Sequence, residues 1–548
     1  MAVLEEQCST VSDGVPPVDF DVVVVGAGFA GLYATHVLRQ HGFSMRVYEK
    51  GDGIGGTWFW NRYPGARVDI QSCEYMFTKF AEIEQEWNWT ELMPAQAEIE
   101  QYLNFVADRL DLRRHVQLDT LVEAMTFDET TATWTTQLST GETVRSSFVI
   151  AATGCLSAPI EPAIEGLHDF AGDTMFTNRF PKQGYDFSGK RVAVVGTGSS
   201  GVQSIPVIAE QADHLFVLQR SAAYTIPSPN RVLEAGELEA LKAEYPEIRK
   251  AQWSSPIGSA RFGAVFQGAE MPNILDTPWE EQLRRVDKLG VVAAFVWADV
   301  RKDVDANQAA RRLYAEGIKR IVSDPQTAEA LVPQYPLGCK RTIIDQGYFP
   351  TFNRPNVSLV DLRTTPITRV VPAGIELADG TLLELDAIVY ATGFDAMTGA
   401  LSRIDVRGRD GRRLGDEWAT KPTAYLGVAV AGFPNLFTVT GPGSPSVLTN
   451  MVTSIEHHVE WITALLGEMR ASGQRVVEAM ADAQDEWADH VTGQAGPIQV
   501  HESCNSWYLG ANVPGKTRAY MPYSAGLDVY MTHCATVAED GYPGFSRC

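Results

Sequence analysis

The chain has 548 residues, of which 45% are hydrophobic and 21% are charged, and its formal net charge is -23. This length predicts several domains with substantial cores, and the acidic balance opposes nonspecific binding to nucleic acid. No apolar run approaches the roughly 18 residues that span a bilayer, and the polar, acidic start lacks the pattern of a signal peptide. We therefore expect a cytoplasmic protein with neither a membrane nor a nucleic-acid partner.

A strand, a glycine-rich turn, a helix and a second strand are predicted between residues 21 and 49. The apolar run 21–25 leads into the turn GAGFAG at 26–31, and residues 45–49 are typical of the second strand. In such a βαβ unit the glycines allow close approach to a pyrophosphate, and an acid ending the second strand accepts from a ribose 2′-hydroxyl. We predict a dinucleotide with a free ribose, most simply FAD, bound by Gly26, Gly28, Gly31 and Glu49.

A tryptophan-rich loop, GTWFWNRYPGARVD, occupies residues 56–69, and a helix is predicted near residues 99–110. Beyond it, alternating apolar and polar residues predict a small β-meander. Its strands are expected at 116–120, 124–128, 133–138 and 143–150, and the last one ends in Ala-Ala-Thr-Gly at 151–154.

A second βαβ unit begins with the apolar run 192–195 and the turn GTGSSG at 196–201. A helix starting near Ser199 and a strand at 214–218 follow, and Arg220 stands where the first unit has its acid. A guanidinium pairs well with a phosphate dianion, so this unit is predicted to bind NADP. One glycine turn alone is a weak signal, but two complete units strengthen each other. The predicted contacts are Gly196, Thr197, Gly198, Ser199, Ser200, Gly201 and Arg220.

Residues 231–333, rich in Ala, Glu, Arg and Leu, are predicted to form a helical insertion in this second unit. Four apolar side chains there either line a substrate chamber or pack in helical cores, and core packing is the commoner use. They are Phe262, Phe266, Phe295 and Trp297. A strand at 381–389 then ends in a second Ala-Thr-Gly, and the loop GPGSP at 441–445 leads into a helix at 452–466, beyond which we expect irregular structure.

These patterns predict an α/β chain with two Rossmann-like dinucleotide-binding domains and an inserted helical subdomain. The FAD-binding domain is expected to comprise residues 1–150 and 390–548, and the NADP-binding domain residues 151–230 and 334–389, around the insertion at 231–333.

Seven cysteines are scattered along the chain without a CxxC pair, which argues against a disulfide scaffold and against a dithiol reductase. We expect them to be thiols; they are Cys8, Cys73, Cys155, Cys339, Cys504, Cys534 and Cys548. His457 and His458 lie on the late helix without spaced partners, so no metal site is predicted.

The segment FAGDTMFTNRFP at 170–181 resembles the fingerprint FxGxxxHxxxWP of type I Baeyer-Villiger monooxygenases. The resemblance spans nearly the whole chain, and the motifs stand in the order found in cyclohexanone monooxygenase and its relatives. They include GTWFWNRYPGARVD, GTGSSG, CKRTIIDQGYFPTFNRPNV, ATGFDAMTGAL, GPGSPSVLTNM and CNSWYLGANVPGK. The fingerprint histidine and tryptophan are Phe176 and Phe180 here. In the family this histidine supports domain movement and cofactor coupling, so the departure bears on turnover more than on the type of reaction.

The resemblance implies oxidation of a ketone to an ester or lactone with NADPH and O2, through a flavin C4a-peroxide. It places Arg341 over the flavin, where a fixed positive charge favours anionic species, with Asp69 orienting it. Lys340 would join Arg220 at the 2′-phosphate of NADP. Without the resemblance, Lys340 and Arg341 would be read as a solvated surface pair and Asp69 as a helix cap.

The resemblance also assigns further cofactor contacts. These assignments are less specific, because apolar and aromatic residues of this kind are often simply part of the core. Those to the flavin are Thr57, Trp58, Trp60, Tyr75, Val122 and Met451. Trp507 lies in a loop near 500–515 that is expected to be mobile and to close over NADP and substrate. Two other functions stay open: a related flavin monooxygenase that oxygenates sulfur or nitrogen, and a degenerate protein that binds FAD and NADP without catalysis.

Overall fold

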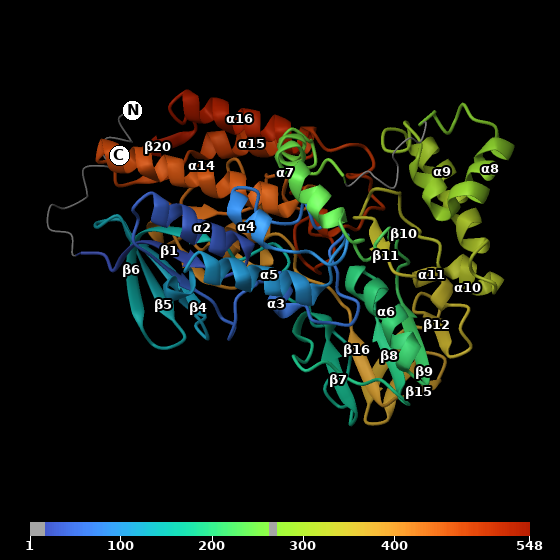
Figure 1. The fold of residues 1–548 in the computed structure, drawn as a ribbon. Coiled ribbons are helices and arrows are strands. Elements are labelled where there is room, and N and C mark those ends of the chain that lie inside the picture. Colours follow the sequence, from blue (N-terminus) through green and yellow to red (C-terminus); the bar gives the residue numbers. More distant parts are fainter. Residues whose placement is uncertain (1–16, 262–270) are drawn as a thin grey trace.

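The computed structural model describes residues 17–261 and 271–548, and two separate sheets dominate it (Figure 1). The first sheet has eight strands in the order β17-β4-β5-β6-β1-β2-β3, with β18 beside β6. The strands are β1 (Phe20–Val25), β2 (Met45–Tyr48), β3 (Val116–Gln117), β4 (Val122–Asp128), β5 (Thr133–Leu138), β6 (Thr143–Ala151), β17 (Asp405–Arg407) and β18 (Leu436–Thr438).

The side chains of β1 alternate between two cores, as the two-residue period of a strand requires. Val22 and Val24 join the core that contains α2 (Phe29–Gln40) and α14 (Met451–Ser472). Val23 and Val25 join a second core with residues of β4 and β5. Because both faces are covered, β1 is a continuous apolar run.

The second sheet has five parallel strands in the order β12-β9-β8-β16-β7. They are β7 (Asp173–Phe176), β8 (Arg191–Val195), β9 (His214–Gln219), β12 (Val357–Asp361) and β16 (Ala387–Tyr390). One face of β8 packs against α6 (Ser199–Gln211) and helices of the insertion. The other face packs against a small antiparallel sheet of β13 (Ile367–Val371), β14 (Gly374–Leu377) and β15 (Leu382–Glu384). The predicted α/β class with two Rossmann-like units is confirmed.

The helices of the insertion pack against two different cores. Leu241, Tyr245 and Ile248 of α7 (Glu237–Trp253) belong to the core of the first sheet. In contrast, α8 (Trp279–Leu289), α9 (Val304–Lys319) and α10 (Pro325–Ala330) pack in the core of the second. Trp297 is buried there, and the partly buried ring of Phe295 packs against the same core, where it contacts Tyr224 and Tyr314. Phe262 and Phe266 lie outside the described residues.

Three predicted elements were wrong. The expected strand at 381–389 is two strands in different sheets, because the chain turns at Asp386, whose backbone and carboxylate both bond to Arg191. Residues 116–120 do not extend the meander, since β3 is a two-residue strand parallel to β2. The chain after α14 is not irregular: it forms β19 (Val477–Ala479), α15 (Ala481–Gly493), α16 (Leu527–Glu539) and β20 (Phe545–Arg547).

The remaining helices and strands complete the fold. They are α3 (Thr57–Trp60), α4 (Ala81–Glu86), α5 (Gln96–Arg109), β10 (Thr225–Pro227), β11 (Ile343–Asp345), α11 (Tyr348–Thr351), α12 (Gly399–Ser402) and α13 (Leu414–Thr420). Within the described ranges, every helix is too short or too polar to cross a bilayer.

Candidate active site

The first glycine turn leaves no space for side chains at two of its positions. Gly26 has a φ of +104°, and a Cβ there would lie 2.6 Å from the carbonyl oxygen of Ala152. A Cβ at Gly31 would lie 1.9 Å from the oxygen of Gly26. The buried carboxylate of Glu49 accepts from the backbone N–H groups of Ala27 and Gly51, each at 2.9 Å. The predicted ribose acid therefore lies beside the turn.

The second turn repeats this geometry. Gly196 has a φ of +109°, and its Cβ would lie 2.6 Å from the oxygen of Ala391, in the second Ala-Thr-Gly. A Cβ at Gly201 would lie 2.1 Å from the oxygen of Gly196. At Gly198, the residue that caps α6, a Cβ would meet no atom within 4 Å. The turn thus presents open space at a helix N-terminus, which is the arrangement that binds a pyrophosphate.

The three hydroxyl residues of this turn have different surroundings. Thr197 is buried, and its hydroxyl donates to the carbonyl oxygen of Ser221 at 2.8 Å. Ser199 is exposed at the first position of α6. The hydroxyl of Ser200 lies 3.1 Å from that of Thr177. Of the three side chains, only that of Ser199 is free in this structure to meet a ligand from solvent.

Two cations meet near the end of β9. Arg220 is exposed immediately after the strand, and the ammonium of Lys340 lies 4.4 Å from the ring centre of Tyr335. Burial, with the charge of Arg220, lowers the pKa of Lys340. Neither cation has a carboxylate partner in the part of the chain that the structure describes. Two adjacent cations without a counterion form a site for a dianion such as phosphate.

The tryptophan-rich loop connects the two turns. At its start, the N–H of Gly55 donates to the oxygen of Ala27 in the first turn at 2.9 Å. Further along, the hydroxyl of Tyr63 donates to the side chain of Gln203 on α6 at 2.8 Å, and Gln203 donates to the oxygen of Arg67 at 3.0 Å. The loop therefore holds both nucleotide units in one arrangement and ends at Asp69.

Arg341 is held by two separate parts of the chain. Its Nε and Nη2 atoms each lie 2.7 Å from Oδ2 of Asp69, and Nη1 donates to the oxygen of Val447 at 2.7 Å. Burial by itself would lower the pKa of Arg341, but the Asp69 carboxylate together with Tyr508 and Tyr75 outweighs it and the pKa is raised. The guanidinium is therefore a fixed positive charge. Asp69 does not cap a helix, since the next one, α4, begins at Ala81.

Two of the predicted flavin contacts pack against each other. The indole N–H of Trp58 donates to the hydroxyl of Tyr75 at 3.2 Å, and their rings meet edge-on. Burial raises the pKa of Tyr75, and the nearby Asp69 raises it further while Arg341 lowers it. Trp58 and Tyr75 thus belong to the surroundings of the charged pair.

The other predicted flavin contacts lie on separate elements. Thr57 begins α3, and the ring of Trp60 lies 4.8 Å from the ammonium of Lys50. Val122 is buried at the start of β4 in the meander core, and Met451 begins α14. No described contact joins these four side chains to Arg341.

Trp507 lies on a short 3-10 turn and is half-buried, with its ring 4.4 Å from the ring of Tyr508. The hydroxyl of Ser506 accepts from the N–H of Tyr508 at 3.1 Å and fixes the turn. Tyr508 is buried near Arg341: burial raises its pKa, and the guanidinium lowers it. The predicted loop thus approaches the Arg341 site.

A family model described as pyridine nucleotide-disulphide oxidoreductase matches residues 23–245. The acetone monooxygenase (methyl acetate-forming) of Gordonia sp. (strain TY-5) is 38% identical over 96% of this chain and 98% of its own length. A Baeyer-Villiger monooxygenase of Pseudooceanicola batsensis is 37% identical over 96% of each chain. A solved structure, an oxidised steroid monooxygenase bound to NADP, is 44% identical with a TM-score of 0.88, covering 96% of this chain and 99% of that one.

The chain belongs to the Baeyer-Villiger monooxygenase family. The resemblance seen in the sequence is thereby confirmed. The predicted enzyme class and the predicted pair of cofactors, FAD and NADP(H), agree with the relatives of this monooxygenase.

The residue in place of the Baeyer-Villiger fingerprint histidine lies beside the second turn. Phe176 ends β7, pairs with Tyr390 of β16, and stacks on its ring at 5.0 Å. The guanidinium of Arg179 lies over the Phe176 ring, 4.2 Å from its centre. Phe180 is buried in the core of the second sheet. An aromatic stack with a cation therefore occupies the position that a histidine holds in the fingerprint.

Sequence reasoning missed two features of this monooxygenase and was wrong about a third. The carbonyl of Val447 and the side chain of Gln203 carry no motif signal, because a backbone acceptor and a lone glutamine look ordinary in any sequence. The expectation that all cysteines are thiols is wrong: Cys339 and Cys504 form a disulfide across 165 residues. Their positions beside Arg341 and Trp507 were the available clue.

Proposed function

We propose that this monooxygenase binds FAD at the first turn and NADPH at the second, and converts a ketone to an ester or lactone. The balanced reaction is ketone + O2 + NADPH + H⁺ giving ester + NADP⁺ + H2O. The observation that carries the proposal is the guanidinium of Arg341, oriented by Asp69 at the end of the loop that joins the two turns.

The residues fit both cofactors. Both glycine turns precede a helix N-terminus, where a pyrophosphate would bind, and the second turn has open space at Gly198. Glu49 in the first unit would repel a 2′-phosphate, whereas Arg220 and Lys340 in the second would bind one. We therefore assign FAD and NADPH in this order, with Ser199 as a further contact at the second turn.

When bound, reduced FAD supplies the activated oxygen, and the chain's own residues stabilise the negative charge that develops beside it. Arginine keeps its proton at every accessible pH, so Arg341 provides a constant positive charge. Asp69 and the Val447 carbonyl fix its orientation in advance, which is the condition for electrostatic stabilisation of a transition state. The side chains of the pair are only 30% and 26% exposed, so water screens this charge less than at the surface.

The same proposal takes in the remaining assignments. Trp58, Tyr75, Thr57, Trp60, Val122 and Met451 would surround the flavin, and Trp507 would lie over the nicotinamide. Residues 1–150 and 390–548 would form the FAD-binding domain and 151–230 and 334–389 the NADP-binding domain, around the insertion at 231–333. The substrate would be a small-molecule ketone, and the location the cytoplasm.

A product assay tests this function. Purified protein with bound flavin is incubated with NADPH, ¹⁸O2 and a panel of small cyclic, bulky polycyclic and linear ketones, and esters or lactones are identified by mass spectrometry. A thioether is run in parallel. We expect one ¹⁸O atom in the ester, and NADH as a poor replacement for NADPH. A protein that oxygenates only the thioether, or that consumes NADPH and releases only hydrogen peroxide on every ketone, would refute the proposal.

A further inference from the structure

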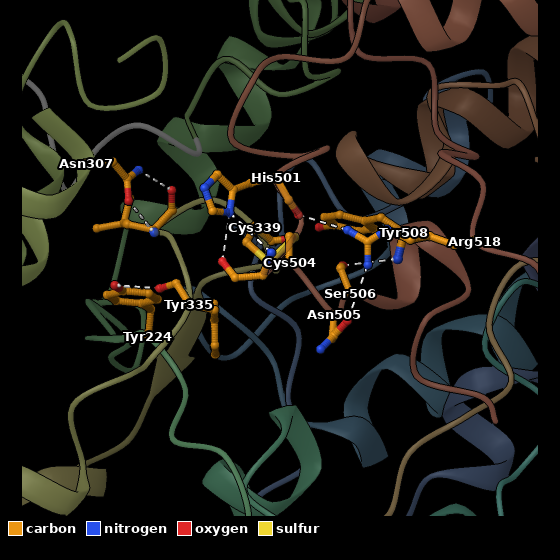
Figure 2. Close-up of a disulfide and its surroundings, with 12 residues drawn as sticks. Tyr224, Asn307, Tyr335, Cys339, His501, Cys504, Asn505, Ser506, Tyr508 and Arg518 are labelled. Carbon is orange, nitrogen blue, oxygen red and sulfur yellow. Dashed lines mark hydrogen bonds between the residues drawn. A yellow bond between two sulfur atoms is a disulfide. The ribbon is translucent and has the colours of Figure 1, made fainter. Parts of the chain in front are cut away.

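The disulfide between Cys339 and Cys504 joins two of the segments that carry proposed NADP contacts. Cys339 is the residue before Lys340 and two before Arg341, and Cys504 is three residues before Trp507. Both cysteines are fully buried, and their Cα atoms are 5.6 Å apart. Figure 2 shows the bond between the turn at Tyr335 and the turn at Ser506.

The Cys339 side of the bond is firmly anchored. The side chain of Asn307 on α9 is buried, donates to the oxygen of Leu337 at 2.8 Å and accepts from its N–H at 2.9 Å. The N–H of Cys339 donates to the oxygen of Pro336 at 3.1 Å, and the hydroxyl of Tyr224 donates to the oxygen of Tyr335 at 3.1 Å. This segment is thus part of the core of the second sheet.

The Cys504 side has weaker support. The N–H of Cys504 donates to the oxygen of His501, and Arg518 donates to His501 and to Asn505 from an exposed position (Figure 2). Apart from the contacts of the Cys504 sulfur, the hydrogen bonds that the structure describes for residues 501–508 stay within residues 496–523. The bonds of His501, Ser503 and Arg518 are exposed and compete with water, so they hold the residues before Trp507 weakly. After Trp507, by contrast, Tyr508 and Leu509 are buried in the core of the first sheet.

The next anchors lie beyond Trp507. The side chain of Asn512 donates to the oxygen of Phe394 at 2.8 Å, and the ammonium of Lys516 lies 2.6 Å from Oδ1 of Asp395. The disulfide and this second anchor therefore bracket Trp507 on both sides. Without the disulfide, the turn that carries Trp507 would be fixed at one end.

We propose that Cys339 and Cys504 are positioning residues: their disulfide holds the Trp507 turn against the segment of Lys340 and Arg341, and its reduction releases the turn and weakens NADP binding. This inference rests on the proposed function, since it takes Lys340 and Trp507 as NADP contacts. Reduction adds two electrons and two protons to the disulfide and yields two thiols, while a dithiol reductant becomes its cyclic disulfide. In a cytoplasm, where disulfides are mostly transient, NADP affinity would follow the redox state.

The test compares oxidised protein, dithiothreitol-treated protein and the variant Cys504→Ala. Peptide mapping after alkylation first establishes the link. The dissociation constant of NADP⁺ and the rate of tryptic cleavage after Arg518 are then measured. If the released turn adopts the conformation that binds NADP⁺ for about a tenth of the time, the dissociation constant of NADP⁺ rises about tenfold. Tryptic cleavage after Arg518 becomes faster. Cys504→Ala should match reduced wild type and should not respond to dithiothreitol.

Cys534→Ala is the matched control, because it removes a buried free thiol without breaking a link, and it should behave as wild type. The inference is overturned if Cys339 and Cys504 are both alkylated without reductant even after oxidation with diamide. It is also overturned if the mapped link is present but its reduction changes neither cleavage nor NADP⁺ affinity. Neither readout uses ester formation, so a failure of the proposed reaction would leave these results distinct.

Discussion

Replacing Arg341 by alanine is the most direct perturbation of the proposed chemistry. The change removes a guanidinium with two nitrogens 2.7 Å from Asp69 and a third bonded to the oxygen of Val447. It leaves the glycine turns and Glu49 untouched. We therefore expect FAD to stay bound while ester formation collapses.

The size of the effect follows from the charge that is lost. Removing one preorganised donor to an oxyanion costs about 2.7 to 4 kcal/mol, which is roughly 10² to 10³ in kcat. Arg341 supplies a full charge at a site only about one-third exposed, so the upper part of this range is expected. Arg341→Lys keeps the charge but loses the planar fork, and should fall between wild type and alanine.

The assay measures ester formed per flavin in single turnovers, with flavin content read from absorbance. Arg109→Ala is the matched control, because the side-chain bonds described for Arg109 all go to exposed Glu82 and Glu86 on α4, and it should retain wild-type turnover. Asp69→Asn should lower turnover by less than Arg341→Ala, since it loosens the guanidinium without removing it. A wild-type rate of ester formation in Arg341→Ala would refute the assigned role of Arg341.

Three further outcomes are expected. Gly198→Ala should weaken NADP⁺ binding at unchanged melting temperature, because its Cβ meets no protein atom but enters the space for the pyrophosphate; unaltered affinity in titration would contradict this. Arg220→Ala and Lys340→Ala should each lower the preference for NADPH over NADH, measured as the ratio of kcat/KM values, by about tenfold or more. The reason is the loss of a charged hydrogen bond, which contributes about 1.5 to 3 kcal/mol. Burial raises the pKa of Glu456 to about 8 despite two bonds from Thr78, so the folded state holds a proton that the unfolded state releases above about pH 4.5. Stability should then fall by up to about 1.4 kcal/mol per pH unit from pH 5 to 8, and Glu456→Gln should lack that slope in denaturant titrations; equal slopes would count against it.

Strands, helices and turns with strong local patterns could be predicted from the sequence. The runs ending at Val25 and Val195 are buried on both faces and are apolar throughout, so their βαβ units were readable. Helix α16 was missed, because we expected irregular structure there, although its buried residues Leu527, Tyr530 and Cys534 have helical spacing. The break at Asp386 depends on a bond to Arg191 from a distant strand, which no local pattern reveals.

The charged residues of the site were found through motifs, whereas their partners were not. Arg341 lies in CKR and Asp69 at the end of the tryptophan-rich loop, and only the resemblance linked the two. Val447 contributes a carbonyl, and every residue has one, so its role depends on tertiary placement. The disulfide was missed for the same reason, since Cys339 and Cys504 are 165 residues apart in sequence and meet only in the folded chain.

The support of Arg341 by Asp69 and Val447 bears on the recombination of this enzyme with its relatives. Arg341 precedes β11, whereas Asp69 and Val447 come from segments before and after the second sheet in sequence. A chimera that takes residues 173–390 from another member would import the cation but keep the host's acid and carbonyl. Crossover points should therefore be chosen so that the donor arginine still meets the carboxylate and the carbonyl of the host. Libraries of such chimeras should be screened for this geometry before they are screened for stability.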